Sequence, residues 1–151
     1  MTIMQHEVEI AGTPDAVLAY ACSAGRWPEW HPSSLRVYGP DGPLPAGAVF
    51  EEDILAGGRN GHLRWEVLDY VPGQRWRARA TGTHALQLLL TYECKPARTG
   101  TLFVRTLDYQ FPGLLMRLAN LLILRRRINR ESAESLRILK RVAESLLESG
   151  R

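Results

Sequence analysis

The chain has 151 residues, of which 45% are apolar and 23% charged, a composition typical of globular proteins large enough for a full-sized core. The net charge of +3 is too small to indicate a nucleic-acid-binding protein, and no apolar run reaches the roughly 20 residues that cross a bilayer. The N-terminus has no signal-peptide pattern, so we expect a cytoplasmic protein whose two cysteines stay reduced. No linker or repeat interrupts the chain, and we expect one domain over residues 1–151.

The first forty residues predict a strand, a helix and an unusual connector. Residues 3–10 alternate as a strand does. The Thr-Pro-Asp sequence at 13–15 is typical of a helix start, and we expect the helix to run to about Ala24. The stretch GRWPEWHPS at 25–33 then combines two tryptophans, two prolines and a histidine. It is too apolar for a solvated loop and too rich in proline for a regular helix or strand.

Strands and turns alone are predicted between residues 35 and 111. Short apolar segments are separated by glycine- and proline-containing turns, which favours an antiparallel meander. The segments are 48–55, 62–71, 74–81, 84–94 and 101–111. In the clearest of them, QRWRARAT, tryptophan and alanine alternate with arginine, so one face of the sheet should be covered and the other solvated.

A long helix is predicted to cover that face. Residues 114–147 contain neither proline nor glycine, and their apolar positions recur at helical spacing over about 50 Å, with at most one break. The first part, 114–124, is apolar nearly all round, and four arginines follow between residues 125 and 130. Three interpretations stay open for this part: the mouth of a cavity, a wider core or dimer seam, and a membrane-surface contact. In the first, the mouth would be lined by Leu114, Met116 and Leu118.

This order of elements resembles the START-like superfamily, also called SRPBCC or Bet v 1-like, and within it the polyketide cyclase/dehydrase and lipid-transport group. The resemblance covers essentially the whole chain. It rests on TPDAVLAYACSAGRWPEWHPS, PLPAGAVFEE, WEVLDYVPGQRW and GTLFVRTLDY. The resemblance implies an α+β helix-grip fold. In that fold, a curved antiparallel sheet of about seven strands wraps around the long C-terminal helix, and two short helices follow the first strand.

The resemblance also suggests a role for the stretch at 25–33. In this fold the two short helices form a V that closes one end of the sheet and grips the last helix. Trp27 and Trp30 would then be wedges under the V, and Pro28 and Pro32 would fix its turns. Packing without any contact to a ligand is the alternative for both tryptophans.

The sequence contains no motif for metal binding, phosphate binding or nucleophilic catalysis, and its four histidines are scattered, so we expect neither a metal nor a cofactor. Strand alternation places Arg105 and Glu52 on the inward face. A buried charge needs a partner, so we expect these two to pair as a polar anchor inside an apolar cavity. A strand bulge that turns one of them outward is the alternative.

We therefore predict a carrier or sensor that binds a small hydrophobic ligand, such as a lipid, an aromatic or a polyketide-like molecule, between the sheet and the last helix. The expected ligand-binding residues are Trp30, Phe50, Glu52, Trp65, Trp76, Leu88, Tyr92, Arg105, Tyr109, Leu114 and Leu118. The alternative is a cyclase or dehydratase that uses the same cavity, with Arg105, Tyr109, Glu52 or His84 as acid or base. A structural protein with a filled core is a third possibility. We expect no nucleic-acid partner and a monomer or homodimer, with transient membrane-surface contact left open.

Overall fold

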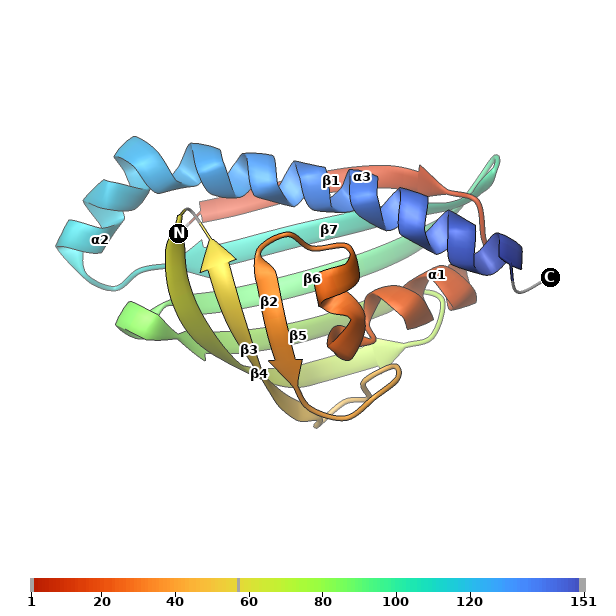
Figure 1. Cartoon of the computed structure of the whole chain (residues 1–151), viewed down its shortest axis with the longest axis horizontal. Coiled ribbons are helices and arrows are strands. Elements are labelled where there is room, and N and C mark those ends of the chain that lie inside the picture. The colour runs from red at the N-terminus through yellow and green to blue at the C-terminus, as the bar shows by residue number, and fades with distance from the viewer. Residues whose placement is uncertain (1, 57, 150–151) are drawn as a thin grey trace.

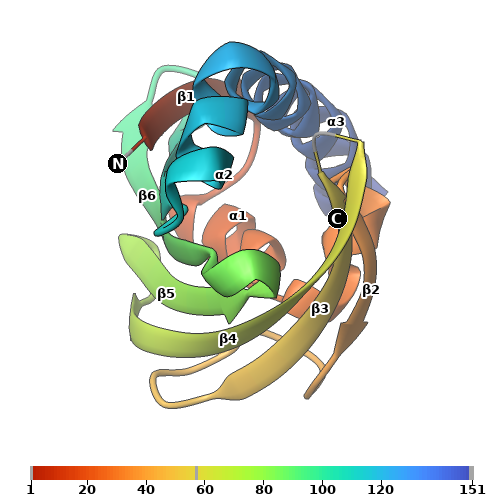
Figure 2. The same cartoon turned by 90° about the vertical axis from the view of Figure 1, so that its left-hand side faces the viewer.

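The computed structural model describes residues 2–56 and 58–149, without the side chains of Ala56, His84 and Ser149. Seven antiparallel strands form one curled sheet, as the resemblance implies, and their order is β1-β7-β6-β5-β4-β3-β2 (Figures 1 and 2). The strands are β1 (Thr2–Ile10), β2 (Ser34–Tyr38), β3 (Val49–Ala56), β4 (Arg59–Val71), β5 (Arg75–Gly82), β6 (Gln87–Ala97) and β7 (Gly100–Gln110). Consecutive strands from β2 to β7 pair with one another, and β1 closes the order by pairing with β7.

The helices lie on the inner face of this sheet and at its ends. Short helices α1 (Pro14–Ala21) and η1 (Ala24–Glu29, a 3₁₀-helix) follow β1, and a 3₁₀ turn, η2 (Thr83–Ala85), precedes β6. The C-terminal helix consists of α2 (Leu114–Ala119), a π-helical turn η3 (Asn120–Leu124) and α3 (Arg125–Ser149). Helix α3 lies across the sheet, as predicted, and α2 projects at the end opposite the C-terminus of α3 (Figure 1).

Helix α1 begins as predicted but ends three residues early. The Thr13 side chain caps the helix by accepting a hydrogen bond from the backbone N–H of Ala16, at 3.3 Å. At the other end, the Trp27 indole N–H donates to the carbonyl oxygen of Ala21 at 2.8 Å. Because this bond satisfies one of the last carbonyls, the chain leaves the α-helix at Ala21 instead of Ala24 and continues into the 3₁₀-helix η1.

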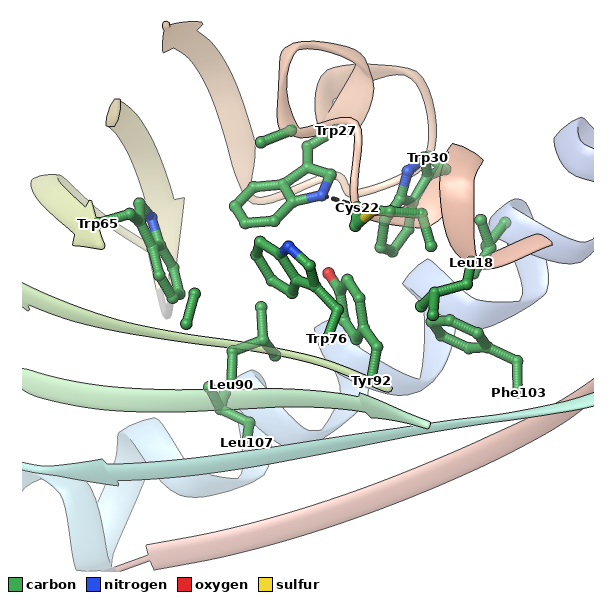
Figure 3. Close-up of a cluster of buried hydrophobic side chains, with 14 of the residues drawn as sticks. Leu18, Cys22, Trp27, Trp30, Trp65, Trp76, Leu90, Tyr92, Phe103 and Leu107 are labelled. Atoms are coloured by element: carbon green, nitrogen blue, oxygen red, sulfur yellow. Dashed lines mark hydrogen bonds between the residues drawn. The ribbon is translucent and has the colours of Figure 1, made fainter. Parts of the chain in front are cut away.

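One end of the molecule, which we call the aromatic end, is filled by rings beneath α1 and η1 (Figure 3). Trp27 lies at its centre, and the ring centroids of Phe50, Trp65 and Trp76 lie 5.4, 5.5 and 6.0 Å from its own, all edge to face. Trp30 is only 1% exposed. Both tryptophans of the connector are therefore packed under the two short helices, as the resemblance implies.

The opposite end carries residues 114–124, which we call the leucine segment. Its buried residue Asn120 accepts a hydrogen bond from the Tyr109 hydroxyl at 2.5 Å and donates one to Thr2 Oγ1 at 3.1 Å. Arg117 Nε also donates to the Phe111 carbonyl oxygen at 2.9 Å. These bonds attach the leucine segment to β7 and β1 through polar groups, while most of its apolar side chains face solvent.

Candidate functional site

A cavity of about 90 Å³ lies between the inner face of the sheet and α3. Most of its wall is apolar, and the polar groups come from the residues that follow η1 and from β3, β6, β7 and α3. The wall comprises Trp27, His31, Ser33, Glu52, Ile54, Leu63, Trp65, Leu86, Leu88, Leu90, Tyr92, Arg105, Leu107, Tyr109, Phe111, Ile128, Glu131 and Ser132. The volume is several times what one water molecule needs. A cavity of this size accommodates a small aromatic ring or a short acyl chain without any movement of its walls.

Arg105 supplies the charge of the polar wall. It lies on β7 opposite Tyr92 of β6 and is 5% exposed. Its guanidinium donates to Ser132 Oγ at 2.9 Å and to His31 Nε2 at 3.0 Å. Among the described residues no carboxylate lies within 4.0 Å of it, so the direct ion pair with Glu52 that alternation suggested is wrong. Two neutral side chains from distant segments hold the guanidinium instead.

His31 is neutral in this arrangement. Burial, with a further contribution from the positive charge of Arg105, lowers the pKa of His31 well below its ordinary value. An arginine can only donate hydrogen bonds, so Nε2 of His31 must be the acceptor and its proton must reside on Nδ1. The imidazole can therefore offer an N–H donor at Nδ1.

Glu52 is the acidic counterpart on β3 and is 4% exposed. One carboxylate oxygen accepts a hydrogen bond from the Trp65 indole N–H at 3.0 Å. Burial raises the pKa of Glu52 to about 7, although this hydrogen bond and the charge of Arg105 oppose the rise. Near neutral pH the cavity therefore contains a carboxyl group that can gain or lose a proton, and an arginine that stays charged.

Three polar atoms of the wall residues are buried without a hydrogen-bond partner among the described residues. They are the Tyr92 hydroxyl, Arg105 Nε and His31 Nδ1. Each can donate a hydrogen bond, and a buried donor that lacks an acceptor costs about 1–3 kcal/mol. All three atoms therefore lack a hydrogen-bond acceptor.

A second cavity of about 70 Å³ adjoins the first towards the leucine segment. The two share five wall residues, namely Ile54, Leu63, Leu86, Phe111 and Ile128. Met116 of α2 and Leu124 of η3 also line the second cavity, together with Arg59, Asn60, Gly61, His62 and Thr83. The apolar interior thus extends from Arg105 to the underside of the leucine segment.

Of the eleven residues expected to bind a ligand, the structure places six in the wall of the first cavity. These are Glu52, Trp65, Leu88, Tyr92, Arg105 and Tyr109. Trp30, Phe50 and Trp76 are buried in the core and lie outside the wall. Leu114 and Leu118 point into solvent because the leucine segment turns them away from the sheet. The side chain of His84, a candidate acid or base, lies outside the described part of the chain.

Four polar wall residues were not singled out from the sequence, namely His31, Ser33, Glu131 and Ser132. The sequence could have indicated Ser132, because this residue lies four positions after Ile128 and four before Leu136, in the apolar stripe of α3. A small polar residue in such a stripe indicates a buried polar partner. Ser33 and Glu131 join the connector to α3, since Ser33 Oγ donates to Glu131 Oε2 at 3.1 Å.

Solved structures of low sequence identity share this fold. The protein TTHA0849 from Thermus thermophilus is 15% identical with a TM-score of 0.80, covering 96% of this chain and 99% of its own. The Zhui aromatase/cyclase from Streptomyces sp. R1128 is 16% identical with a TM-score of 0.75, covering 95% and 93%. Ara h 8.0201 is 10% identical with a TM-score of 0.67, covering 95% and 98%.

The sequence comparisons agree with this architecture. No curated protein sequence matches the chain. The family model described as polyketide cyclase / dehydrase and lipid transport matches residues 1–144, nearly the whole length. Together with the seven-stranded sheet and its long C-terminal helix, this match confirms the resemblance drawn from the sequence, and the chain belongs to the polyketide cyclase/dehydrase and lipid-transport family of the SRPBCC, or Bet v 1-like, superfamily.

Proposed function

We propose that this protein is a carrier or sensor that binds a small, largely apolar ligand with one acceptor or anionic group, such as a carboxylate, in the cavity next to Arg105. The proposal rests on one observation, that hydrogen-bond donors of the polar wall have no acceptors. Tyr92, Arg105 and His31 each carry a buried donor without a partner among the described residues, and all three residues line a cavity whose other walls are mainly apolar. An oxygen-bearing head group would supply the missing acceptors, and an apolar body would fill the remainder.

Charge favours the same kind of ligand. Arg105 has no carboxylate within ion-pair distance among the described residues, and its hydrogen-bond partners, His31 and Ser132, are neutral. Below pH 7 Glu52 is mostly protonated and offsets little of the charge of Arg105. A buried positive charge of this kind binds an anion more strongly than an exposed one would, because little water screens it.

A cyclase- or dehydratase-type enzyme is the second candidate function. The observation that favours it is Glu52, whose pKa of about 7 suits an acid or base at neutral pH, in the same wall as Arg105 and Tyr92. Catalysis would also require a proton donor and acceptor within hydrogen-bond reach of one substrate atom. We favour the carrier because Tyr92, Arg105 and His31 gather donors without partners, whereas the hydrogen bond described for the Glu52 carboxyl group comes from the Trp65 indole and not from another ionisable group.

The test compares two ligands that differ only in the head group. We expect 2-naphthoate to bind the wild-type protein about tenfold or more tightly than naphthalene at pH 6, as hydrogen bonds to a charged group allow. Arg105→Met should remove that preference, whereas Arg64→Met, on the exposed face of β4, should keep it. Isothermal titration calorimetry measures both affinities, and circular dichroism checks that each variant is folded.

Equal affinity for the two ligands in the wild-type protein would contradict the acceptor-bearing head group. If Arg105→Met does not fold, Arg105→Lys keeps the charge and removes only the fork of donors, and it should weaken 2-naphthoate binding without affecting naphthalene. Native mass spectrometry of the protein purified from cells would then identify the chemical class of a retained ligand.

A further inference from the structure

The leucine segment presents an apolar surface that the fold does not use. Six large side chains of this short stretch are 51% to 82% exposed. They are Leu114, Leu115, Leu118, Leu121, Leu122 and Ile123. Scattered exposed apolar residues are ordinary, but six within ten consecutive positions mark an interaction surface.

The backbone of the segment explains how so many apolar residues face outward. The π-helical turn η3 places one extra residue in its turn relative to an α-helix, so the apolar stripe of α3 does not continue into α2. Asn120 occupies the inward position and bonds to Tyr109 and Thr2. Because a polar residue anchors the segment, the leucines around it remain free to contact something else.

The charge around this surface has one sign. Residues 112–130 contain five arginines and no acidic residue, a net charge of +5. Since the whole chain carries +3, the remaining residues carry −2. Arg125, Arg126 and Arg127 directly follow the leucine segment and are exposed. The region that contains the apolar surface therefore carries the whole positive charge excess of the protein.

We propose that the leucine segment docks on the surface of a bilayer that contains anionic phospholipids, with its leucines among the acyl chains and the arginines at the phosphates. Apolar side chains next to a basic cluster are the features that hold helices in the membrane interface. No helix of the described residues is long and apolar enough to span a membrane, so the contact is interfacial. A second copy of the chain fits less well, because a symmetric dimer through this surface would bring two +5 regions together.

Docking would also place the cavities at the membrane. Met116 and Leu124 of the segment form part of the wall of the second cavity, which adjoins the first. Figure 2 shows α2 at the end of the curled sheet that faces the viewer. Movement of the segment on the bilayer would therefore open the apolar interior directly towards lipid. The docking itself does not depend on the ligand proposed above.

The test is sedimentation with vesicles of phosphatidylcholine alone or with 30% phosphatidylglycerol, at low and high salt. The wild-type protein should bind the anionic vesicles, and added salt should weaken the binding. Leu121→Ser/Leu122→Ser should weaken it at least about tenfold, because two exposed leucines leave the acyl region. The matched control, Leu35→Ser/Leu55→Ser, removes two exposed leucines from β2 and β3 and should bind as the wild type does.

A second pair of variants isolates the charge. Arg125→Gln/Arg126→Gln should weaken binding to anionic vesicles about fivefold for each arginine. Arg64→Gln/Arg79→Gln, on the outer face of the sheet, should have little effect. Absence of vesicle binding by the wild type, or equal loss in target and control variants, would overturn the proposal. The proposal would also be overturned if the wild-type protein did not bind vesicles but formed a dimer in analytical ultracentrifugation, and the Leu121→Ser/Leu122→Ser variant did not form that dimer.

The same variants separate this proposal from the ligand proposal. Leu121 and Leu122 line neither of the two cavities, so 2-naphthoate should bind the double leucine variant as it binds the wild type. Loss of vesicle binding with retained 2-naphthoate binding supports docking. Vesicle binding without any 2-naphthoate binding would contradict the proposed function and leave the docking surface supported.

Discussion

The two ends of this molecule use apolar side chains in opposite ways. At the aromatic end, Trp27 and Trp30 come from a short irregular connector and are almost completely buried beneath α1 and η1. At the other end, the leucine segment is helical throughout, as the α-helix α2 and the π-helical turn η3, yet six of its apolar side chains face solvent. Helical structure is therefore no guide to burial here. The proline-containing connector stabilises the fold, and the proline-free leucine segment presents a surface.

The cavity lies between these ends, and this position explains its mixed walls. Trp27 and Trp65 form its boundary towards the aromatic end, while Phe111 and Ile128 continue towards the leucine segment. Tight aromatic packing on one side resists deformation, whereas few buried contacts hold the leucine segment on the other. If a ligand larger than the cavity enters, we expect the leucine end to move.

The largest effect on stability should come from the aromatic end. Trp30→Ala should lower the free energy of unfolding by about 3–5 kcal/mol, because it removes a fully buried ring and leaves a void beneath η1. Urea unfolding monitored by circular dichroism measures the change. A loss below about 1 kcal/mol would show that the ring contributes little to gripping the helices, and the contrast between the ends would fail.

An effect that depends on pH should come from the middle of the molecule. The folded-state pKa of Glu52 is about 7, above its ordinary 4.5, so the folded protein retains a proton that the unfolded chain releases. This contribution to stability is fully present below pH 4.5 and is lost as the pH rises through 7. Glu52→Gln cannot ionise, so at pH 8 it should be more stable than the wild type by about 3 kcal/mol.

At pH 5 the Glu52→Gln variant and the wild type should differ much less. His31 acts in the opposite direction, because its lowered pKa makes the folded state lose stability as the pH falls below 6.5. The wild-type curve combines both groups, and the difference between wild type and variant isolates Glu52. Glu7→Gln, exposed on β1, is the control. The same difference at pH 5 and pH 8 would mean that Glu52 does not titrate with a raised pKa.

Short-range patterns predicted the sheet and its inward face, but not the contacts that build the polar wall. Alternation placed Trp76, Phe103, Glu52 and Arg105 inward, and all four are buried. The partners of Arg105 escaped prediction because His31 lies 74 residues away along the chain. No periodicity relates a connector to a strand that distant, and only the packing of η1 and α3 against the sheet brings them together.

The leucine segment shows a second limit of prediction from sequence patterns. Its helical spacing correctly predicted a helix, yet apolar residues on all sides fit a buried core, a cavity mouth and an exposed surface equally well. The decisive features are the π-helical turn and the inward Asn120, which forms tertiary hydrogen bonds with Tyr109 and Thr2. Pattern alone thus left the function of this segment open.

The smallest effect on stability should come from the leucine end, and it completes the comparison with Trp30. Leu122→Ser should change the free energy of unfolding by less than about 0.5 kcal/mol, because the side chain is 68% exposed and buries little area. Leu139→Ala, at a fully buried position of α3, should by contrast cost about 2–5 kcal/mol in the same urea titration. A cost above about 1 kcal/mol for Leu122→Ser would mean that the leucine is packed in solution, against the protein itself or a second copy. The apolar surface at this end would then be occupied already and could not serve to dock on a bilayer.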